Sequence, residues 1–215
     1  MARVVPNYAA PWVEQGSAVA RPREFDEAQV IRRAADVFWE KGYQDASLPD
    51  LLSGMGLTRG SLYKAFHDKK SLYLRVLDLY EVSVVEPLVA RLTDPYVADG
   101  RLRIIGLFKS VVQQVDAGDR RGCMLCTASS GVEMSDPQIA AAVQTGLRRL
   151  RDGIDHALAA STLHAGLSAP KRQVLANLLL TQYVGLQVLA RSCLPLGIVE
   201  QSVQGIDALL RAQDG

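Results

Sequence analysis

Apolar residues recur with a helical period along most of this 215-residue sequence. Such spacing predicts amphipathic helices that each turn one face toward a core. The segments expected to be helical are residues 24–42, 48–55, 58–66, 68–86, 102–115, 123–134, 137–158, 169–193 and 198–212. No stretch of the sequence shows the alternation of apolar and polar residues that is typical of a half-buried strand. The pattern therefore predicts an all-α protein.

Two of these segments are short and are separated by a glycine turn. Ser47 can cap the first and Thr58 the second, because a hydroxyl oxygen accepts a hydrogen bond from a free amide in the first helical turn. Gly56 lies between them, where a left-handed residue commonly ends a helix. A short helix, a glycine turn and a second short helix form the helix-turn-helix pattern, whose second helix enters the major groove of DNA.

The second short helix has one apolar and one polar side. Leu62 and Phe66 are four residues apart and share a face. The remaining faces carry hydrogen-bond donors suited to phosphate oxygens and guanine acceptors, namely Arg59, Ser61, Tyr63 and Lys64. Residues 58–75 contain five cations and one acid, whereas the formal net charge of the chain is only +1. Positive charge is thus concentrated near the expected DNA-reading surface.

Residues 31–72 resemble the DNA-binding domain of the TetR family of transcriptional regulators. The run from Arg59 to Tyr63, followed by Phe66 and Lys69, is the most specific part of the resemblance. The candidate DNA-binding residues are Ser47, Thr58, Arg59, Gly60, Ser61, Tyr63, Lys64, His67 and Lys69. We expect Arg59 and Lys64 at base edges. Phosphate contacts are expected for Tyr63, His67 and Lys69, as the resemblance also implies for the tyrosine and the lysine.

Lys69 and Lys70 follow Asp68, which is placed to cap the next helix. Cations in a first helical turn oppose the helix dipole, at a cost of a few tenths of a kcal/mol unless a negative partner is present. DNA phosphate would be such a partner, and a solvated lysine pair is the alternative. We favour a phosphate contact for Lys69, which falls on a family position, and leave Lys70 open.

Three parts of the chain are expected to differ in role. Residues 1–22 contain prolines but no helical period, which predicts a flexible N-terminal arm. The arginines at its end, Arg21 and Arg23, could reach a DNA minor groove or carry incidental charge on a disordered terminus. Residues 23–68 are expected to form the helix-turn-helix domain, and residues 69–215 a regulatory domain for ligand binding and dimerisation.

The last two helices, around residues 170–190 and 198–212, carry more apolar surface than a small domain easily buries. In the TetR family such a pair packs on its copy as a four-helix dimer interface. A homodimer also suits a palindromic operator, because two reading heads related by a two-fold axis match two half-sites. Burial within one chain is the alternative for either helix alone.

The resemblance also implies a small organic effector bound within the C-terminal helices. Apolar walls with a few polar groups suit such a ligand, although ordinary core packing explains any one of these residues as well. The candidate lining residues are Phe108, Val112, Met124, Thr127, Leu147, Leu150, Gln182 and Tyr183.

Cys123 and Cys126 form a CxxC motif at the start of an expected helix, and Cys193 is expected to be buried. A cysteine at a helix N-terminus can react with oxidants or electrophiles, so the pair has a redox interpretation. Zinc would need two further ligands, and no second cysteine pair is present in the sequence, so no metal site is predicted. The alternative is that both sulfurs pack as small apolar groups.

Catalysis finds little support in the sequence. The chain has no phosphate-binding glycine loop, and its histidines are scattered, with His156 and His164 expected at the surface. We therefore predict no catalytic residue, no cofactor and no enzymatic activity.

A sequence pI of about 7.7 does not indicate a bulk polyanion binder, so any nucleic-acid surface must be local.

The sequence shows no basic signal peptide and no run of about 18 apolar residues, so we expect no membrane partner and a cytoplasmic location. The predicted function is a ligand-responsive transcriptional regulator, most often a repressor in this family, that a small-molecule effector releases from double-stranded DNA. The rival interpretation is an all-α small-molecule binding protein or enzyme with a non-functional head.

Overall fold

The computed structural model describes residues 26–212, so the predicted arm at residues 1–22 and Arg23 lie outside the described residues. Within residues 26–212 the chain is helical and has no strand, which confirms the all-α prediction. The helices are α1 (Glu27–Asp45), α2 (Leu48–Met55), α3 (Arg59–Phe66), α4 (Lys69–Tyr80), the π-helical η1 (Glu81–Val85), α5 (Glu86–Leu92), α6 (Gly100–Asp116), α7 (Met124–Ala128), the 3-10 helix η2 (Val132–Ser135), α8 (Pro137–Ala159), α9 (Ala169–Arg191) and α10 (Leu196–Arg211).

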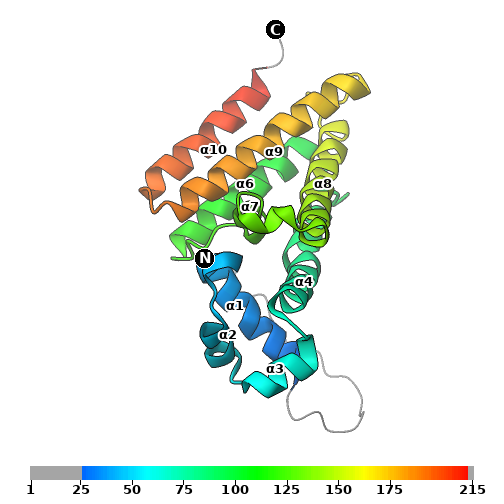
Figure 1. Ribbon diagram of the computed structural model, residues 1–215. Coiled ribbons are helices and arrows are strands. Elements are labelled where there is room, and N and C mark those ends of the chain that lie inside the picture. Colours follow the sequence, from blue (N-terminus) through cyan, green and yellow to red (C-terminus); the bar gives the residue numbers. More distant parts are fainter. Residues whose placement is uncertain (1–25, 213–215) are drawn as a thin grey trace.

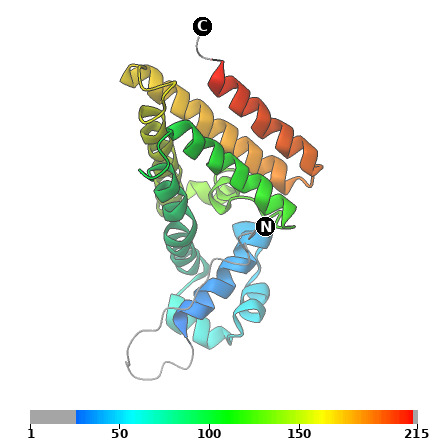
Figure 2. The same cartoon turned by 180° about the vertical axis from the view of Figure 1, so that it is seen from behind.

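The helices form a small head and a larger bundle (Figure 1). The head consists of α1, α2 and α3, and the bundle contains α5 to α10. α4 runs from the head into the bundle, and α9 and α10 lie at the end far from α3 (Figure 1). The view from behind shows the same separation (Figure 2). α1 packs against both α2 and α4, while α8 packs against α9 and α10 against α6.

Local side-chain chemistry sets the helix boundaries in the head as predicted. Ser47, Thr58 and Asp68 each accept a hydrogen bond from a backbone amide in the helix that follows. Gly56 ends α2 with a φ of 67°, a conformation that glycine adopts at little cost. Gly42 was expected to stop the first helix, and its φ of 82° interrupts α1 at that point.

Aromatic rings join α4 to the head. The ring of Tyr73 on α4 lies 4.8 Å from Phe38 and 4.8 Å from Tyr43, measured between centroids. Tyr73 and Phe38 are each only 2% exposed. Such pairs contribute roughly 0.5–1.5 kcal/mol each beyond the burial of area. The first turns of α4 therefore move with the head.

α4, η1 and α5 follow one another without a break, and Pro87 lies in the first turn of α5. Proline lacks an amide hydrogen and its ring meets the carbonyl four residues earlier, which distorts a regular α-helix. Here the distortion takes the form of the π-helical segment η1. The helix type thus changes just before Pro87, and the chain continues as α5.

Three details differ from the sequence expectations. The expected helix at 123–134 is broken into α7 and η2, since Ser129 and Ser130 donate to the carbonyls of Cys126 and Thr127 at the end of α7. His164 was expected at the surface but is 1% exposed, with its Nδ1 2.8 Å from the hydroxyl of Ser161. The expectation that Cys193 is buried is also wrong.

Cys193 is exposed because the chain reverses direction there, between α9 and α10. Its φ of 59° places it in the left-handed region, and Pro195 follows two residues later. A turn of this kind runs over the surface of a protein.

α6 approaches α8 very closely at Gly100. The amide of Gly100 donates to the carbonyl of Ala160 at 3.1 Å, and a Cβ at Gly100 would lie 1.7 Å from the carbonyl oxygen of Ala157. The contact involves backbone atoms, so a small side-chain movement could not relieve the overlap. Only glycine fits at this crossing.

Gly100→Ala should lower the free energy of unfolding by about 2–4 kcal/mol, because the two helix ends must separate to admit the methyl group. Gly106→Ala is the matched control, since Gly106 lies in the same helix with nothing within 4 Å of an added Cβ. The control should gain up to about 1 kcal/mol from the higher helix propensity of alanine. Urea unfolding followed by circular dichroism measures both, and equal stabilities for the two variants would contradict the close-packing explanation.

Candidate DNA-binding surface and regulatory cavity

α3 presents a row of exposed polar side chains at the far end of the head. Arg59, Lys64 and His67 are exposed, and Tyr63 is 46% exposed. None of these four side chains forms a hydrogen bond or ion pair with another residue of the described range 26–212. Leu62 and Phe66, on the opposite side of α3, are buried in the core. Burial of the apolar side of α3 therefore turns these donors toward solvent, where they are available to a ligand.

The other predicted residues around α3 have structural roles. The hydroxyl of Ser47 donates to Asp50 at 2.6 Å within a capping box. The hydroxyl oxygens of Thr58 and Ser61 lie 3.0 Å apart, and Thr58 also accepts from the amide of Ser61. Gly60 is exposed, with nothing within 4 Å of an added Cβ. Ser47 thus fixes the start of α2, while Thr58 and Ser61 fix the start of α3 and leave its N-terminus open to solvent.

Of the five cations in residues 58–75, three have partners within the protein. Lys70 pairs with Asp136 at 2.6 Å, and Arg75 with Glu27 at 3.0 Å. Lys69 donates to the carbonyl of Gln44 at 3.3 Å and lies 4.7 Å from the ring centroid of Tyr43. Partial burial lowers the pKa of Lys69. Carboxylates thus neutralise Lys70 and Arg75, whereas Arg59, Lys64 and Lys69 form no ion pair within residues 26–212 and keep positive charge for an external anion.

His67 ends α3 in a strained conformation. Its φ of 64° is unusual for a residue other than glycine, and the amide of Asp68 donates to the carbonyl of Phe66 at 2.7 Å around it. This is a γ-turn with positive φ, which is rare in proteins. The turn leaves the His67 side chain exposed between the end of α3 and the Asp68 cap of α4.

A cavity of about 350 Å³ lies between the head and the bundle. Its walls are mostly apolar or aromatic, with some hydroxyl, amide and charged groups. The lining residues are Trp39, Tyr80, Ser83, Val84, Pro87, Leu88, Arg91, Ser110, Gln114, Asp119, Arg121, Gly122, Tyr183 and Gln187. The π-helical bend and α5 supply one wall, and the loop after α6 supplies another.

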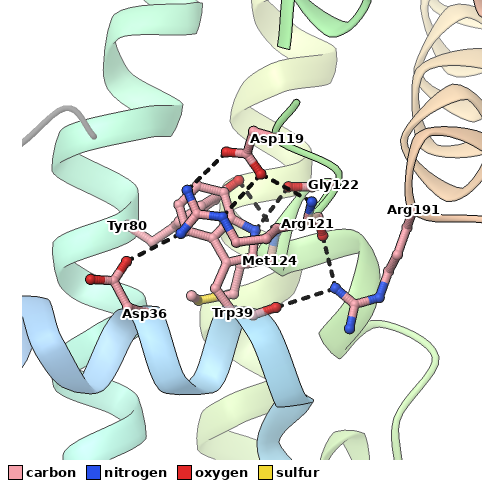
Figure 3. Close-up of polar contacts among 8 residues, drawn as sticks. All are labelled: Asp36, Trp39, Tyr80, Asp119, Arg121, Gly122, Met124 and Arg191. Atoms are coloured by element: carbon pink, nitrogen blue, oxygen red, sulfur yellow. Dashed lines mark hydrogen bonds and ion pairs between the residues drawn. The ribbon is translucent and has the colours of Figure 1, made fainter. Parts of the chain in front are cut away.

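Trp39 of α1 is held by the loop between α6 and α7 (Figure 3). Its indole N–H donates to the carbonyl of Gly122 at 2.9 Å, and the guanidinium of Arg121 lies 4.2 Å from its ring centroid. Its ring also meets Tyr80 edge to face, with centroids 5.2 Å apart. Trp39 is therefore almost fully buried, at 6% exposed, and joins α1 to α4.

Arg121 connects two carboxylates (Figure 3). It binds Asp119 through Nε at 3.0 Å and Nη2 at 2.8 Å, and Asp36 of α1 through Nη1 at 3.1 Å. Burial alone would raise the pKa of Asp119, but the hydrogen bonds from Arg121 outweigh it and lower that pKa. Arg191 of α9 adds bonds to the carbonyls of Trp39 and Arg121, at 3.2 and 2.9 Å. We call Trp39, Asp119, Arg121 and Arg191 the latch.

Comparison with known proteins decides the family. Residues 30–76 match the model of bacterial regulatory proteins of the tetR family. The chain is 31% identical over 141 residues to the uncharacterised HTH-type transcriptional regulator YezE of Bacillus subtilis, covering 65% of this chain and 72% of the relative. The chain belongs to the TetR family. It is also 31% identical over 130 residues to the HTH-type transcriptional repressor BdcR of Escherichia coli, covering 58% of this chain and 61% of that protein.

Solved structures of TetR regulators have the same architecture. A cysteine mutant of the TetR family regulator CifR, complexed with 26-base-pair double-strand operator DNA, aligns with a TM-score of 0.72 and 27% identity, covering 86% of this chain and 98% of that one. The protein is therefore a transcriptional regulator with a DNA-binding helix-turn-helix, built from α2 and α3. The two relatives named here are described as a transcriptional regulator and a transcriptional repressor.

The predicted effector residues of this TetR protein are only partly brought together. Tyr183 lines the cavity, and Phe108 is buried beside it with ring centroids 6.2 Å apart. Gln182 is exposed, and the amide in the cavity wall is Gln187, because Gln187 falls on the buried face of α9. Thr127 lines a different cleft. Val112, Met124, Leu147 and Leu150 are buried or half-buried but do not line the cavity.

The two cysteines of the CxxC motif lie together next to the cavity. The hydroxyl of Tyr80 donates to the sulfur of Cys123 at 3.3 Å. A hydrogen bond from Cys126 lowers the pKa of Cys123, and the same bond raises the pKa of Cys126. Both thiols are about 95% buried, yet they line a cleft of about 310 Å³ together with Gln187 and the exposed Val188. Packing and chemical reactivity are therefore both compatible with this position.

Proposed function

We propose that this protein is a ligand-responsive repressor that binds a palindromic operator as a homodimer and is released by a small organic effector. The observation that carries the proposal is the exposed donor row of α3, whose side chains have no partner within residues 26–212. The family and the relatives support it, since BdcR is named a repressor and CifR was solved on operator DNA.

In this proposal α3 lies in the major groove. Arg59, in the first turn, and Lys64 bind base edges, for which a guanidinium facing guanine is the commonest specific contact. Tyr63, His67 and Lys69 bind phosphates and fix the register on the duplex. Ser47, Thr58, Gly60 and Ser61 border the groove at the start of α2 and α3. The DNA-binding domain comprises residues 23–68, and residues 69–215 form the regulatory domain.

The proposed dimer interface is a stripe of exposed residues along α9. Val174, Leu178, Thr181, Gly185 and Val188 are all exposed and follow one another at alternating spacings of four and three. This is the heptad spacing of a helix that packs lengthwise on another helix. Gly185 has nothing within 4 Å of an added Cβ, so a second backbone could approach closely there.

α10 carries a matching stripe beside the one on α9. Ile198 and Leu209 are 41% and 70% exposed, and Ser202 and Gly205 lie between them at the same alternating spacing. Gly205 also has no neighbour within 4 Å of an added Cβ. An apolar stripe on each of two adjacent helices supports four-helix packing between two copies.

α9 also has the length and composition of a membrane-spanning helix, with a mean hydropathy of 1.3 over an 18-residue window of which 39% is buried in one chain. Core helices of water-soluble proteins pass the same test. Packing of its exposed stripe on a second copy would account for the apolar surface, so we propose a cytoplasmic protein without a membrane partner.

Effector binding would act on DNA affinity through the latch. The cavity wall includes Trp39, Asp119 and Arg121, which are the same groups that hold α1 against the bundle. A ligand with higher affinity for a different head position shifts the population toward that position. If the shifted spacing of the two heads does not match the operator half-sites, affinity for DNA falls by the same coupling free energy.

A second candidate function is thiol-based sensing of electrophiles or oxidants. It is favoured by the contact between Tyr80 and Cys123, because Tyr80 belongs to α4 and touches Trp39. Addition of the Cys123 thiolate to an electrophilic double bond would form a carbon–sulfur bond, with a proton from solvent completing the adduct. The resulting thioether sulfur is only a weak acceptor for the Tyr80 hydroxyl. The change would then reach the same contacts that the proposed effector reaches.

Arg59→Ala should weaken binding to an operator selected from random DNA by about 1–3 kcal/mol and relax preference at one position of each half-site. Lys69→Ala should weaken binding about equally on operator and scrambled DNA, and flatten the salt dependence by roughly one phosphate contact per subunit. Titrations of DNA at several salt concentrations measure the affinity of both variants. Lys171→Ala is the control, because Lys171 is an exposed residue of α9. Wild-type binding by both variants would exclude α3 as the reading helix. Absence of any salt-sensitive DNA binding by the wild type would favour the non-functional head.

Leu178→Glu should convert the dimer to a monomer at micromolar concentration. Each interface would carry two buried carboxylates, which should raise the dissociation constant by a factor of about 100 or more. Val132→Glu is the control, because Val132 is 67% exposed and lies outside the stripes. Analytical ultracentrifugation distinguishes the species, and a wild-type protein that sediments as a monomer would contradict the proposed dimer.

N-ethylmaleimide should weaken operator binding by the wild type through addition of the Cys123 thiolate to its double bond. Cys123→Ser should keep its DNA affinity under the same treatment. Cys193→Ser should respond like the wild type, since Cys193 is exposed in the turn between α9 and α10 and makes no hydrogen bond with Tyr80. A gel-shift series with Cys126→Ser included decides the matter: if Cys123→Ser and Cys126→Ser both respond as strongly as the wild type, the thiol hypothesis is wrong.

A further inference from the structure

The side-chain amide of Gln187 is buried in the cavity wall with one end unpaired. Gln187 is 4% exposed, and its Nε2 donates to the hydroxyl of Tyr183 at 2.9 Å. Its Oε1 is buried and has no hydrogen-bond partner among the residues that the structure describes. A buried carbonyl oxygen without a donor is costly and is rare in folded proteins.

The neighbouring hydroxyl groups do not supply the missing donor. The Tyr80 hydroxyl donates to Cys123 and accepts from the amide of Met124, so both of its roles are taken. The Tyr183 hydroxyl accepts from Gln187, and its own proton has no acceptor within residues 26–212. In the amide orientation of this structure, with Nε2 toward Tyr183, two unmet roles lie side by side, an acceptor on Gln187 and a donor on Tyr183. A single hydroxyl group could meet both, because it donates once and accepts as well. The opposite amide orientation would pair Oε1 with the Tyr183 hydroxyl and leave Nε2 as the unpaired group.

The charges of the cavity compensate one another. Asp119 is bound by Nε and Nη2 of Arg121, and the remaining guanidinium nitrogen, Nη1, binds Asp36. Arg91, which also lines the cavity, is engaged in an interaction of its own. Apart from Ser83, Ser110, Gln114 and Gln187, the remaining lining is aromatic, aliphatic or glycine, with Trp39, Tyr183 and Leu88 among it. An ion would lose its hydration here without gaining a free countercharge, so the walls favour a neutral, largely apolar ligand.

We propose that the cavity binds a small uncharged aromatic alcohol or phenol, whose hydroxyl donates to Gln187 Oε1 and accepts from the Tyr183 hydroxyl. The inference rests on the proposed effector function and names the chemical class of its ligand. A volume of about 350 Å³ accommodates two fused rings. The ring system lies between Trp39 and the α5 wall, and the hydroxyl selects the ligand through the unpaired amide end.

Calorimetric titration with 2-naphthol and 2-methoxynaphthalene tests the class, since methylation keeps the ring system and the oxygen acceptor but removes the donor. The wild type should bind 2-naphthol at least about tenfold more tightly than the ether. Gln187→Leu should bind the two probes with nearly equal affinity. Gln182→Leu is the matched control, because Gln182 is an exposed glutamine on the same helix, and it should keep the wild-type preference.

Leu88→Trp locates the probe, since the larger side chain fills the cavity and should reduce binding of 2-naphthol without touching Gln187. Equal affinity of the wild type for both probes would overturn the proposal. It would indicate that a water molecule, and not the ligand hydroxyl, donates to Gln187 Oε1. A preference that survives in Gln187→Leu would overturn it as well, as would failure of the wild type to bind 2-naphthol.

Operator titrations in the presence of 2-naphthol separate this inference from the proposed function. If the probe binds through Gln187 but leaves operator affinity unchanged, the ligand class stands and the effector role fails. If the protein binds operator but not the probe, the regulator stands and the ligand class fails. Release of the operator by 2-naphthol but not by its methyl ether would support both.

Discussion

Trp39 is the residue through which the head and the bundle hold one another. Its ring is enclosed by Tyr80 of α4 and by the guanidinium of Arg121, its N–H is bound by the carbonyl of Gly122, and its own carbonyl is bound by Arg191. These contacts come from three separate segments of the bundle. The orientation of α3 depends on them, because α1 carries Trp39 and forms the head together with α2 and α3. Trp39 and Arg121 also border the cavity. A ligand in the cavity would therefore touch the same side chains that fix the position of the head.

The head could be predicted from the sequence because its boundaries are local. Ser47, Thr58 and Gly56 act within one turn of the chain, so residue type and spacing suffice to place α2 and α3. The regulatory site depends instead on long-range packing. No local sequence pattern indicates that Arg121, in the loop between α6 and α7, contacts Asp36 and Trp39 of α1.

α9 explains why the cavity residues were harder to assign. It is apolar on more than one face, with Leu179 and Leu186 turned to the core and Leu178 and Val188 exposed. A helix with two apolar faces gives no single stripe from which to infer the inward direction. Gln182 and Gln187 are therefore equally plausible in the sequence, and only the packing of α9 in the folded chain makes Gln187 the buried one. The same two-sidedness places the cavity and the proposed dimer stripe on opposite flanks of one helix.

The close crossing at Gly100 gives α6 a fixed end. Its first residue is bound to Ala160 and lies against Ala157 without room for even a methyl group. Its other end, Asp116, leads into the loop that carries Asp119 and Arg121. α6 also packs against α10, α8 and α5, so it is enclosed by the bundle on several sides. Because the Gly100 end has no spare room, a displacement of α6 relative to α8 would have to be accommodated toward Asp116, at the end that leads to the contacts with Trp39.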